Sequence, residues 1–194
     1  MHRTCKGHVD EFRGAEIGRF GGAVRRIAVL GCSGSGKSTL AAALAERLSL
    51  PYVATDAVFW ASDWRPTPMA EVRAWLDAAT AADSWVTDGN FDGDRDLLWA
   101  RADVLVWIDL PLGRVLAQGF GRNLGWWLSG AKVWNSQRMT LAKAIDGARH
   151  QLRSHGLKRR AYPGWLAEHP QATVVRITEA GRIADRVQRV LDAL

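Results

Sequence analysis

The sequence lacks the features that mark secreted, membrane-spanning or zinc-binding proteins. Its 194 residues contain two cysteines, Cys5 and Cys32, so neither a structural disulfide nor a zinc site rich in cysteine is expected. No apolar run approaches the roughly 18 residues of a membrane span. Residues 1–23 carry charges throughout and have no apolar segment of the secretory-signal type. We therefore expect a cytoplasmic protein without a membrane partner.

Acidic residues are scarce in one quarter of the chain. Between positions 112 and 160 there are ten Lys or Arg residues and a single acid, Asp146, whereas the whole chain has a net charge of +6. A block of this kind either binds something anionic or forms a solvated face. The composition alone leaves both interpretations open.

Short apolar segments alternate with helix-like segments from Val24 onward. Strands are predicted at 27–30, 52–54, 85–87, 104–108 and 172–177. Helices are predicted at 37–48, 68–82, 94–101, 137–152 and 182–194, and a further helix begins at 112. Thr67 is expected to cap the helix that begins at Pro68. This alternation is typical of a parallel sheet covered on both faces. We expect a single α/β domain over 24–194, after a poorly ordered extension over 1–23.

The segment after the first predicted strand fits the pattern G-x-x-x-x-G-K-[ST], with Gly31, Gly36, Lys37 and Ser38 at its fixed positions. Glycines allow backbone N–H groups to surround a polyphosphate, and the following helix adds its positive end. In this pattern the lysine reaches the β- and γ-phosphates and the hydroxyl ligates Mg²⁺. The sequence thus predicts ATP and Mg²⁺ as cofactors, bound by Gly31, Ser33, Gly34, Ser35, Gly36, Lys37, Ser38 and Thr39.

Three aspartates, Asp56, Asp88 and Asp109, follow predicted strands. Because parallel strands share one carboxyl edge, we expect these side chains on the same edge as the glycine-rich loop. A carboxylate there can hold Mg²⁺ or accept a proton from an attacking hydroxyl. An aspartate after a strand can also simply form a turn, and this alternative stays open for all three.

Four segments in order, "GCSGSGKST", "YVATDAVFW", "WVTDGNF" and "VLVWIDLP", resemble the adenylate-kinase-related P-loop small-molecule kinases. "VWNSQR" at 133–138 resembles their FlaR-like branch, also called DNA topology modulation proteins. The resemblance implies a three-layer P-loop fold with five parallel strands in the order 2-3-1-4-5 and a basic helical lid near 119–160. It also implies that Asp56 faces the phosphoryl acceptor and that Asp88 takes a position associated with Mg²⁺.

The sequence departs from this family at two places. Two arginines follow the "D-x-P" turn in adenylate kinases; Arg122 matches the phosphate-contacting one, but Gln118 replaces the adenine-stacking one. The arginine that binds an acceptor phosphate is missing from "GNFD" at 89–92, where Arg95 is a possible substitute. The nucleotide preference and the acceptor therefore stay open.

Arginines that close over a transferring phosphoryl group accelerate related reactions by ~10³–10⁵. Candidates in the basic block are Arg122, Arg138, Arg149 and Arg153, whereas a solvated cluster is expected at Lys158, Arg159 and Arg160. The favoured hypothesis is an ATP-dependent phosphotransferase with a small-molecule acceptor, its catalytic residues being Lys37, Asp56, Asp88, Arg122 and Arg138, and Mg²⁺ held by Ser38 and Asp88. The alternatives are a P-loop protein that associates with nucleic acid and a nucleotide-binding regulator with slow hydrolysis. The oligomeric state is left open.

The ten tryptophans are unusually many for this length. Their apolar surroundings predict core positions for Trp75, Trp85, Trp99 and Trp107. Trp60 and Trp64 follow Asp56 closely, where they either stack on a planar acceptor or pack beneath a loop.

Overall fold

The computed structural model describes residues 24–59, 65–133 and 137–194, apart from the side chains of residues 56 and 57. The elements in chain order are β1 (Arg26–Gly31), α1 (Lys37–Leu48), β2 (Tyr52–Val53), α2 (Asp56–Phe59), α3 (Met69–Ala79), β3 (Trp85–Thr87), α4 (Arg95–Arg101), β4 (Val104–Ile108), α5 (Leu112–Ser129), β5 (Lys132–Val133), β6 (Gln137–Arg138), α6 (Leu141–Ala167), β7 (Thr173–Ile177) and α7 (Ile183–Leu191). Trp60, Trp64, Trp134 and the predicted extension over 1–23 lie outside the described residues.

Five parallel strands form the sheet in the order β2-β3-β1-β4-β7. Because β7 is the fifth strand of this sheet, the predicted order is confirmed. Its label differs only because a short antiparallel hairpin, β5–β6, intervenes in the chain and was not predicted. β1 lies at the centre, where Ile27 pairs with Val86 on one side and with Val104 on the other.

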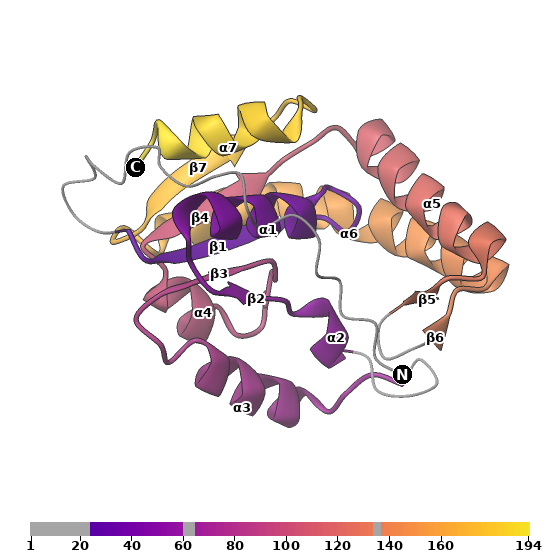
Figure 1. Cartoon of the computed structure of the whole chain (residues 1–194), viewed down its shortest axis with the longest axis horizontal. Coiled ribbons are helices and arrows are strands. Elements are labelled where there is room, and N and C mark those ends of the chain that lie inside the picture. Colours follow the sequence, from indigo (N-terminus) through magenta and orange to yellow (C-terminus); the bar gives the residue numbers. More distant parts are fainter. Residues whose placement is uncertain (1–23, 60–64, 134–136) are drawn as a thin grey trace, which may run out of the picture.

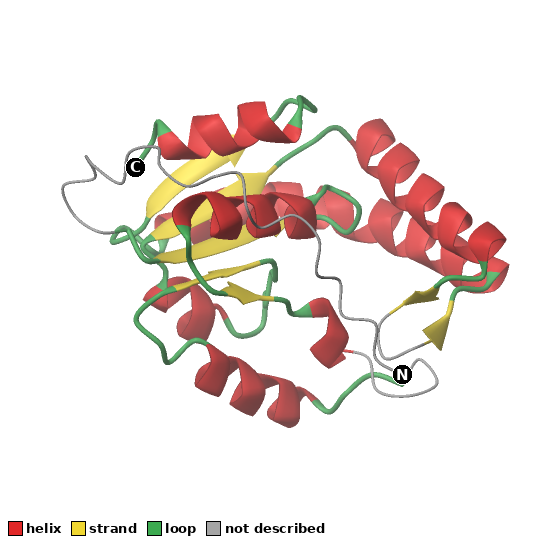
Figure 2. Cartoon of the chain, in the orientation of Figure 1, coloured by secondary structure: helices red, strands yellow, loops and turns green. Residues whose placement is uncertain are grey.

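Helices cover both faces of the sheet (Figure 2). Ile27 and Val29 of β1 pack on the face covered by α1 and α7, whereas Ala28 and Leu30 pack on the face covered by α3, α4 and α6. Alternate residues of a strand point to opposite faces, so one short apolar strand contributes to both cores. The core positions predicted for the tryptophans are confirmed, since Trp85, Trp99 and Trp107 are buried and Trp75 packs at the edge of the second core.

The helix α6 differs most from its prediction. It begins at Leu141 rather than at Gln137, which belongs to β6, and it continues through Pro163 to Ala167 instead of ending near Leu152. Proline disfavours a helix interior, but here Tyr162 and Leu166 are buried against the sheet. Their packing outweighs the local preference. A smaller correction concerns α3, whose N-terminal cap is Pro68 and not Thr67.

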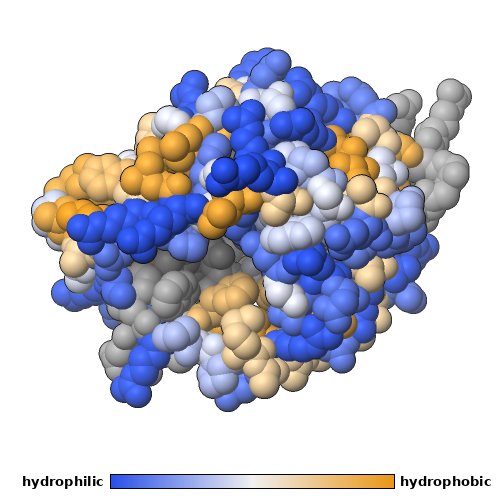
Figure 3. Space-filling view, turned by 180° about the vertical axis from the view of Figure 1, so that it is seen from behind, coloured by the Kyte–Doolittle hydropathy of each residue, from blue (hydrophilic) through white to orange (hydrophobic). Residues whose placement is uncertain are grey.

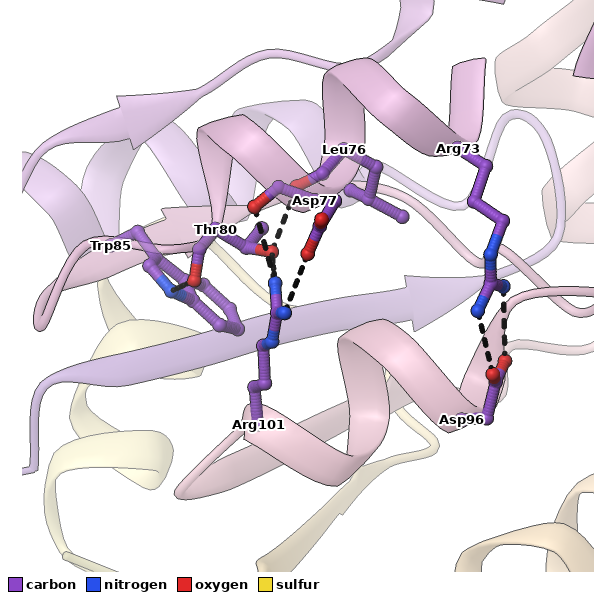
Figure 4. A network of polar contacts seen from close by, with 7 residues as sticks. All are labelled: Arg73, Leu76, Asp77, Thr80, Trp85, Asp96 and Arg101. Atoms are coloured by element: carbon purple, nitrogen blue, oxygen red, sulfur yellow. Dashed lines mark hydrogen bonds and ion pairs between the residues drawn. The ribbon is translucent and has the colours of Figure 1, made fainter. Parts of the chain in front are cut away.

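Two arginine forks join α3 to α4 (Figure 4). Arg101 on α4 donates to Asp77 at 2.6 Å and to the Thr80 hydroxyl at 2.9 Å, while Arg73 on α3 donates to Asp96 at 2.7 Å. Their hydrogen bond and opposite charge raise the pKa of Arg73 and lower the pKa of Asp96. These contacts fix α3 against α4.

No helix in the described ranges has both the length and the apolar character that crossing a membrane would require.

Candidate active site

The glycine-rich loop joins the end of β1 to the start of α1. Gly34 and Gly36 have φ angles of +82° and +91°, a region that side chains disfavour. A Cβ on Gly31 would stand 2.7 Å from the carbonyl oxygen of Ile108, and one on Gly34 would stand 2.9 Å from the Cα of Gly119. Both contacts are too close, so the loop needs glycine at these positions to keep this shape. The result is a compact backbone turn around the first residues of α1.

The N-terminus of α1 is open to an anion. Its cap is Gly36, which has no side chain and so makes no side-chain capping bond in the part of the chain that the structure describes. The buried Oγ of Ser35 likewise has no hydrogen-bond partner there. The Nζ of Lys37 donates to the carbonyl oxygen of Cys32 at 3.2 Å, folded back over the loop. The N–H groups at a helix start that has a glycine cap, next to an ammonium group, suit a phosphate chain.

The segment after β3 is joined to this loop. The Oδ1 of Asn90 accepts a hydrogen bond from the backbone N–H of Gly31 at 2.8 Å. Asp88 is 2% exposed, and its Oδ1 accepts from the backbone N–H of Thr55 at 3.1 Å and from the Thr55 hydroxyl at 3.3 Å. Since β3 pairs directly with β1, the carboxylate of Asp88 stands on the same sheet edge as the loop.

The third candidate on this edge, Asp56, is the first residue of α2. It directly follows Thr55, which Asp88 binds, so the backbone brings Asp56 to the neighbourhood of Asp88. The Asp56 side chain lies outside what the structure describes.

Asp109 has a different role. It is buried at the end of β4 and is held by two arginines, Arg176 of β7 at 3.0 Å and Arg159 of α6 at 3.3 Å. Two cations already neutralise this carboxylate, so it ties α6 to the end of β4 and reinforces the pairing of β4 with β7. Lys158 similarly pairs with Asp92 at 2.7 Å. The expected solvated cluster at 158–160 is therefore wrong for Lys158, whereas Arg159 is ion-paired but half exposed and Arg160 is exposed.

The second half of α6 forms a wall beside the glycine-rich loop. The Nε2 of Gln151 donates to the carbonyl oxygen of Ser33 at 3.1 Å, and the Oγ of Ser154 lies 3.4 Å from the Sγ of Cys32. Farther along, His155 hydrogen-bonds the carbonyl of Leu110 at 2.8 Å. These residues were not predicted, because a glutamine, a serine and a histidine on a helix match no motif.

The basic arm consists of α5 from residue 120, the hairpin β5–β6, and α6 up to residue 149. In Figure 1, α5 and α6 lie side by side and the hairpin closes their far end. Arg122 is exposed; its guanidinium stacks 4.6 Å above Trp126 and reaches the Oδ1 of Asn123. The Cα of Gly119 adjoins Gly34, so Arg122, three residues on, lies about 4.5 Å farther along the helix.

The other candidate arginines also lie on exposed surface. Arg138 is in the hairpin at the end of the arm, and the helix between Leu141 and Gln151 alone spans about 15 Å. Arg149 pairs with Asp146, and Arg153 is exposed. Arg95, the possible acceptor-binding substitute, instead stacks 4.0 Å above Trp165. The structure thus gathers Lys37, Asp88 and the Asp56 backbone, and leaves Arg122 and Arg138 on the arm.

The site fits a magnesium–nucleotide complex better than a resident metal. No group of three or more His, Cys, Asp or Glu side chains within the described ranges is placed to hold an ion. Mg²⁺ commonly keeps several waters and takes only one or two protein ligands together with phosphate oxygens. Ser38 and Asp88 can supply those ligands.

Comparisons with known proteins agree with this architecture. No family model matches the chain. It is 31% identical to the uncharacterised protein YqaC of Bacillus subtilis (strain 168), over 88% of this chain and 97% of YqaC. The chain belongs to the YqaC family. The chain is also 38% identical to an adenylate kinase of Streptomyces griseus, but only over 52% of this chain and 41% of that enzyme.

Two solved kinase structures share the fold of this chain. A gluconokinase from Sinorhizobium meliloti 1021 superposes with a TM-score of 0.54 at 20% identity, covering 88% of this chain and 91% of that one. A shikimate kinase from Acinetobacter baumannii, solved in complex with shikimate, gives a TM-score of 0.57 at 17% identity, covering 87% and 92%. The fold is therefore that of the P-loop small-molecule kinases. The narrower FlaR-like placement stays a prediction.

Proposed function

We propose that this YqaC-family protein is a kinase that transfers the γ-phosphoryl group of ATP to a small-molecule acceptor. The observation that carries the proposal is the glycine-rich loop, which presents Lys37 and the glycine-capped start of α1 on the same sheet edge as the buried Asp88. The P-loop kinase fold and the partial similarity to an adenylate kinase support it.

Each residue of the site has a role in this proposal. The backbone N–H groups of residues 33–39 and the ammonium of Lys37 bind the phosphate chain, after Lys37 releases the carbonyl of Cys32. Ser38 and Asp88 hold Mg²⁺, which supplies charge neutralisation on the phosphates. Asp56 orients the acceptor hydroxyl and receives its proton. Arg122 and Arg138 offset the negative charge that builds up on the transferring group.

Arg122 and Arg138 lie at different distances from the glycine-rich loop. Arg122 is about 4.5 Å along α5 from Gly119, which adjoins Gly34, a gap that a long side chain bridges. Arg138 lies at the end of the arm, so its role requires the arm to bend toward the loop. The two assignments are therefore independent and can be tested separately.

The acceptor belongs to one of two chemical classes, a hydroxyl compound or a phosphate. Nothing in the described part of α4 replaces the missing phosphate-binding arginine, since Arg95 is engaged with Trp165 and the carbonyl of Asp92. This favours a hydroxyl acceptor.

A pooled metabolite screen with γ-labelled ATP tests the proposal. The wild-type protein is expected to label one class of compound, and Lys37→Ala is expected to abolish the transfer while the protein stays folded. Arg47→Ala, at the exposed far end of the same helix, is the matched control and should keep full activity. Unchanged turnover in Lys37→Ala would falsify the assignment of the loop.

The two alternatives give other outcomes in the same series of experiments. A nucleic-acid-binding protein would bind DNA or RNA with an affinity that falls steeply with salt, because its basic arm would displace counterions. A regulator would hydrolyse ATP slowly, and no compound of the pool would accelerate that hydrolysis or become labelled.

A further inference from the structure

One arginine is buried beside the glycine-rich loop without a matching acid. Arg186 on α7 is 7% exposed, and its Nε has no hydrogen-bond partner among the residues that the structure describes. Its Nη1 would lie 3.4 Å from a Cβ built on Gly36, the cap of α1. The guanidinium is therefore directed at the open N-terminus of α1 from the side opposite the α6 wall.

The other arginines of α7 show what is unusual about Arg186. Arg182 pairs with Asp185, and Arg189 pairs with Glu179, both on the outer surface. Arg186 shares the inner side of the helix with Val187 and Val190, and none of the described carboxylates forms an ion pair with it. An arginine at an apolar position of an amphipathic helix is costly to bury, because its charge loses water without gaining a counter-charge.

The surroundings add further positive charge. The pKa of Arg186 is lowered by burial and, secondarily, by the nearby charge of Arg114 on α5. Next to it stands the positive end of α1, whose cap Gly36 it adjoins. Three sources of positive potential, Arg186, Arg114 and the start of α1, thus meet at one place, and a multiply charged anion offsets them. A neutral base or a ribose carries no charge that could offset this positive potential.

We propose that Arg186 is a nucleotide-binding residue that contacts the phosphate chain of ATP and closes the α7 side of the phosphate site, with Arg114 beside it. This inference rests on the proposed function, because it takes the anion to be the triphosphate of the kinase substrate. It assigns to α7 a direct part in nucleotide binding, although that helix contains no recognisable motif.

Isothermal titration with three probes, MgATP, magnesium tripolyphosphate and adenosine, tests the proposal. Arg186→Met replaces the arginine by an apolar side chain that fits the buried position. It is expected to weaken both MgATP and tripolyphosphate by about 10- to 100-fold, the usual value of a charge-assisted hydrogen bond. Arg186→Lys should recover part of the loss. The control Arg189→Met, on the exposed side of the same helix, should bind within about twofold of wild type.

The thermal midpoint of the ligand-free protein separates binding from a merely structural role. Removing an uncompensated buried charge should leave the midpoint of Arg186→Met equal to or above that of wild type. A clearly lower midpoint with unchanged affinity would assign Arg186 to the scaffold. Weaker MgATP with unchanged tripolyphosphate would place it on the base or ribose and overturn the proposal. If the wild-type protein binds neither polyphosphate, the proposed function itself fails and this inference falls with it.

Discussion

The two halves of α6 have similar basic sequences but very different surroundings. In the second half, Lys158 and Arg159 are neutralised by Asp92 and Asp109 at the sheet edge, and Tyr162 is fully buried. In the first half, which belongs to the basic arm, the side chains face outward. Figure 3 shows the molecule from behind, with hydrophobic residues gathered at the left, the end where the arm lies in this view. The exposed apolar residues of the arm include Leu128, Leu141 and Ile145. Charge of one sign in the sequence thus says little until its counter-charges are located.

The difference also separates stability from chemistry. The anchored half of α6 contacts the glycine-rich loop through Gln151 and Ser154 and holds it in position. The arm carries Arg122 and Arg138, which have no part in the core. We therefore expect substitutions in the anchored half to cost folding free energy and substitutions in the arm to cost turnover.

The largest expected loss comes from Tyr162→Ala. The ring packs against Trp99, Trp107 and Trp165, with centroids 5.5 to 5.7 Å apart, and its hydroxyl donates to Asp92 at 2.9 Å. Removing it should lower the free energy of unfolding by about 3–5 kcal/mol, measured by urea denaturation. Leu141→Ala, in the arm half of α6 at a position 41% exposed, is the control and should lose less than about 1 kcal/mol. Equal losses of unfolding free energy in the two variants would show that the two halves of α6 contribute equally to stability.

Arg122→Ala should affect chemistry instead. We expect kcat for the acceptor found in the screen to fall by at least about 100-fold, or roughly 2.7 kcal/mol, with nucleotide affinity and stability nearly unchanged. Steady-state kinetics and nucleotide titration measure the two effects separately. Weaker nucleotide binding with an unchanged kcat would reduce Arg122 to a docking residue.

Asp109→Asn removes the charge that Arg159 and Arg176 share. Because both arginines are about half exposed and keep contact with water, the expected loss is moderate, about 1–2 kcal/mol. Thermal denaturation measures it. Asp146→Asn, which breaks the exposed pair with Arg149 in the arm, should change stability by less than about 0.5 kcal/mol. An Asp109→Asn variant as stable as the wild type would mean that the ion pairs do not hold α6 to the sheet.

The smallest effect concerns His150, at the border between the halves. Partial burial, and then the charges of Lys158 and Lys37, lower its pKa below the ordinary 6.5. The unfolded chain then takes up the proton more readily than the folded one, so stability should fall as the pH drops through about 6.5 toward the lower folded pKa. His150→Gln should remove this part of the acid sensitivity, as followed by the thermal midpoint between about pH 7.5 and 5.5. Arg153→Gln, which changes a charge that does not titrate there, should keep it.

Much of the fold could be predicted because its signals are local. The five apolar strands and the glycine-rich loop are contiguous in sequence, and the strand order followed from the family resemblance. The hairpin β5–β6 was missed because two-residue strands carry no pattern. The extent of α6 was missed because Pro163 argues against a helix, and only the packing of Tyr162 on the distant Trp99 and Trp107 overrides that preference.

The candidate site divides in the same way. Lys37 and Ser38 belong to a motif, and Asp88 follows a strand, so the sequence alone pointed to them. Gln151 and Arg186 come from helices far along the chain and meet the loop only in the folded protein. A signal for Arg186 did exist, since it stands among Val187, Val190 and Leu191 on the apolar side of α7. An arginine on such a face indicates a ligand or an ion pair, but not which of them.

A crystal structure with Mg²⁺ and a non-hydrolysable ATP analogue tests the central claim most directly. We expect the triphosphate to lie within hydrogen-bond distance of the backbone N–H groups of residues 33–39, with the Nζ of Lys37 moved from the carbonyl of Cys32 to a phosphate oxygen. A nucleotide bound elsewhere, or a loop left empty at a saturating concentration of the analogue, would contradict it.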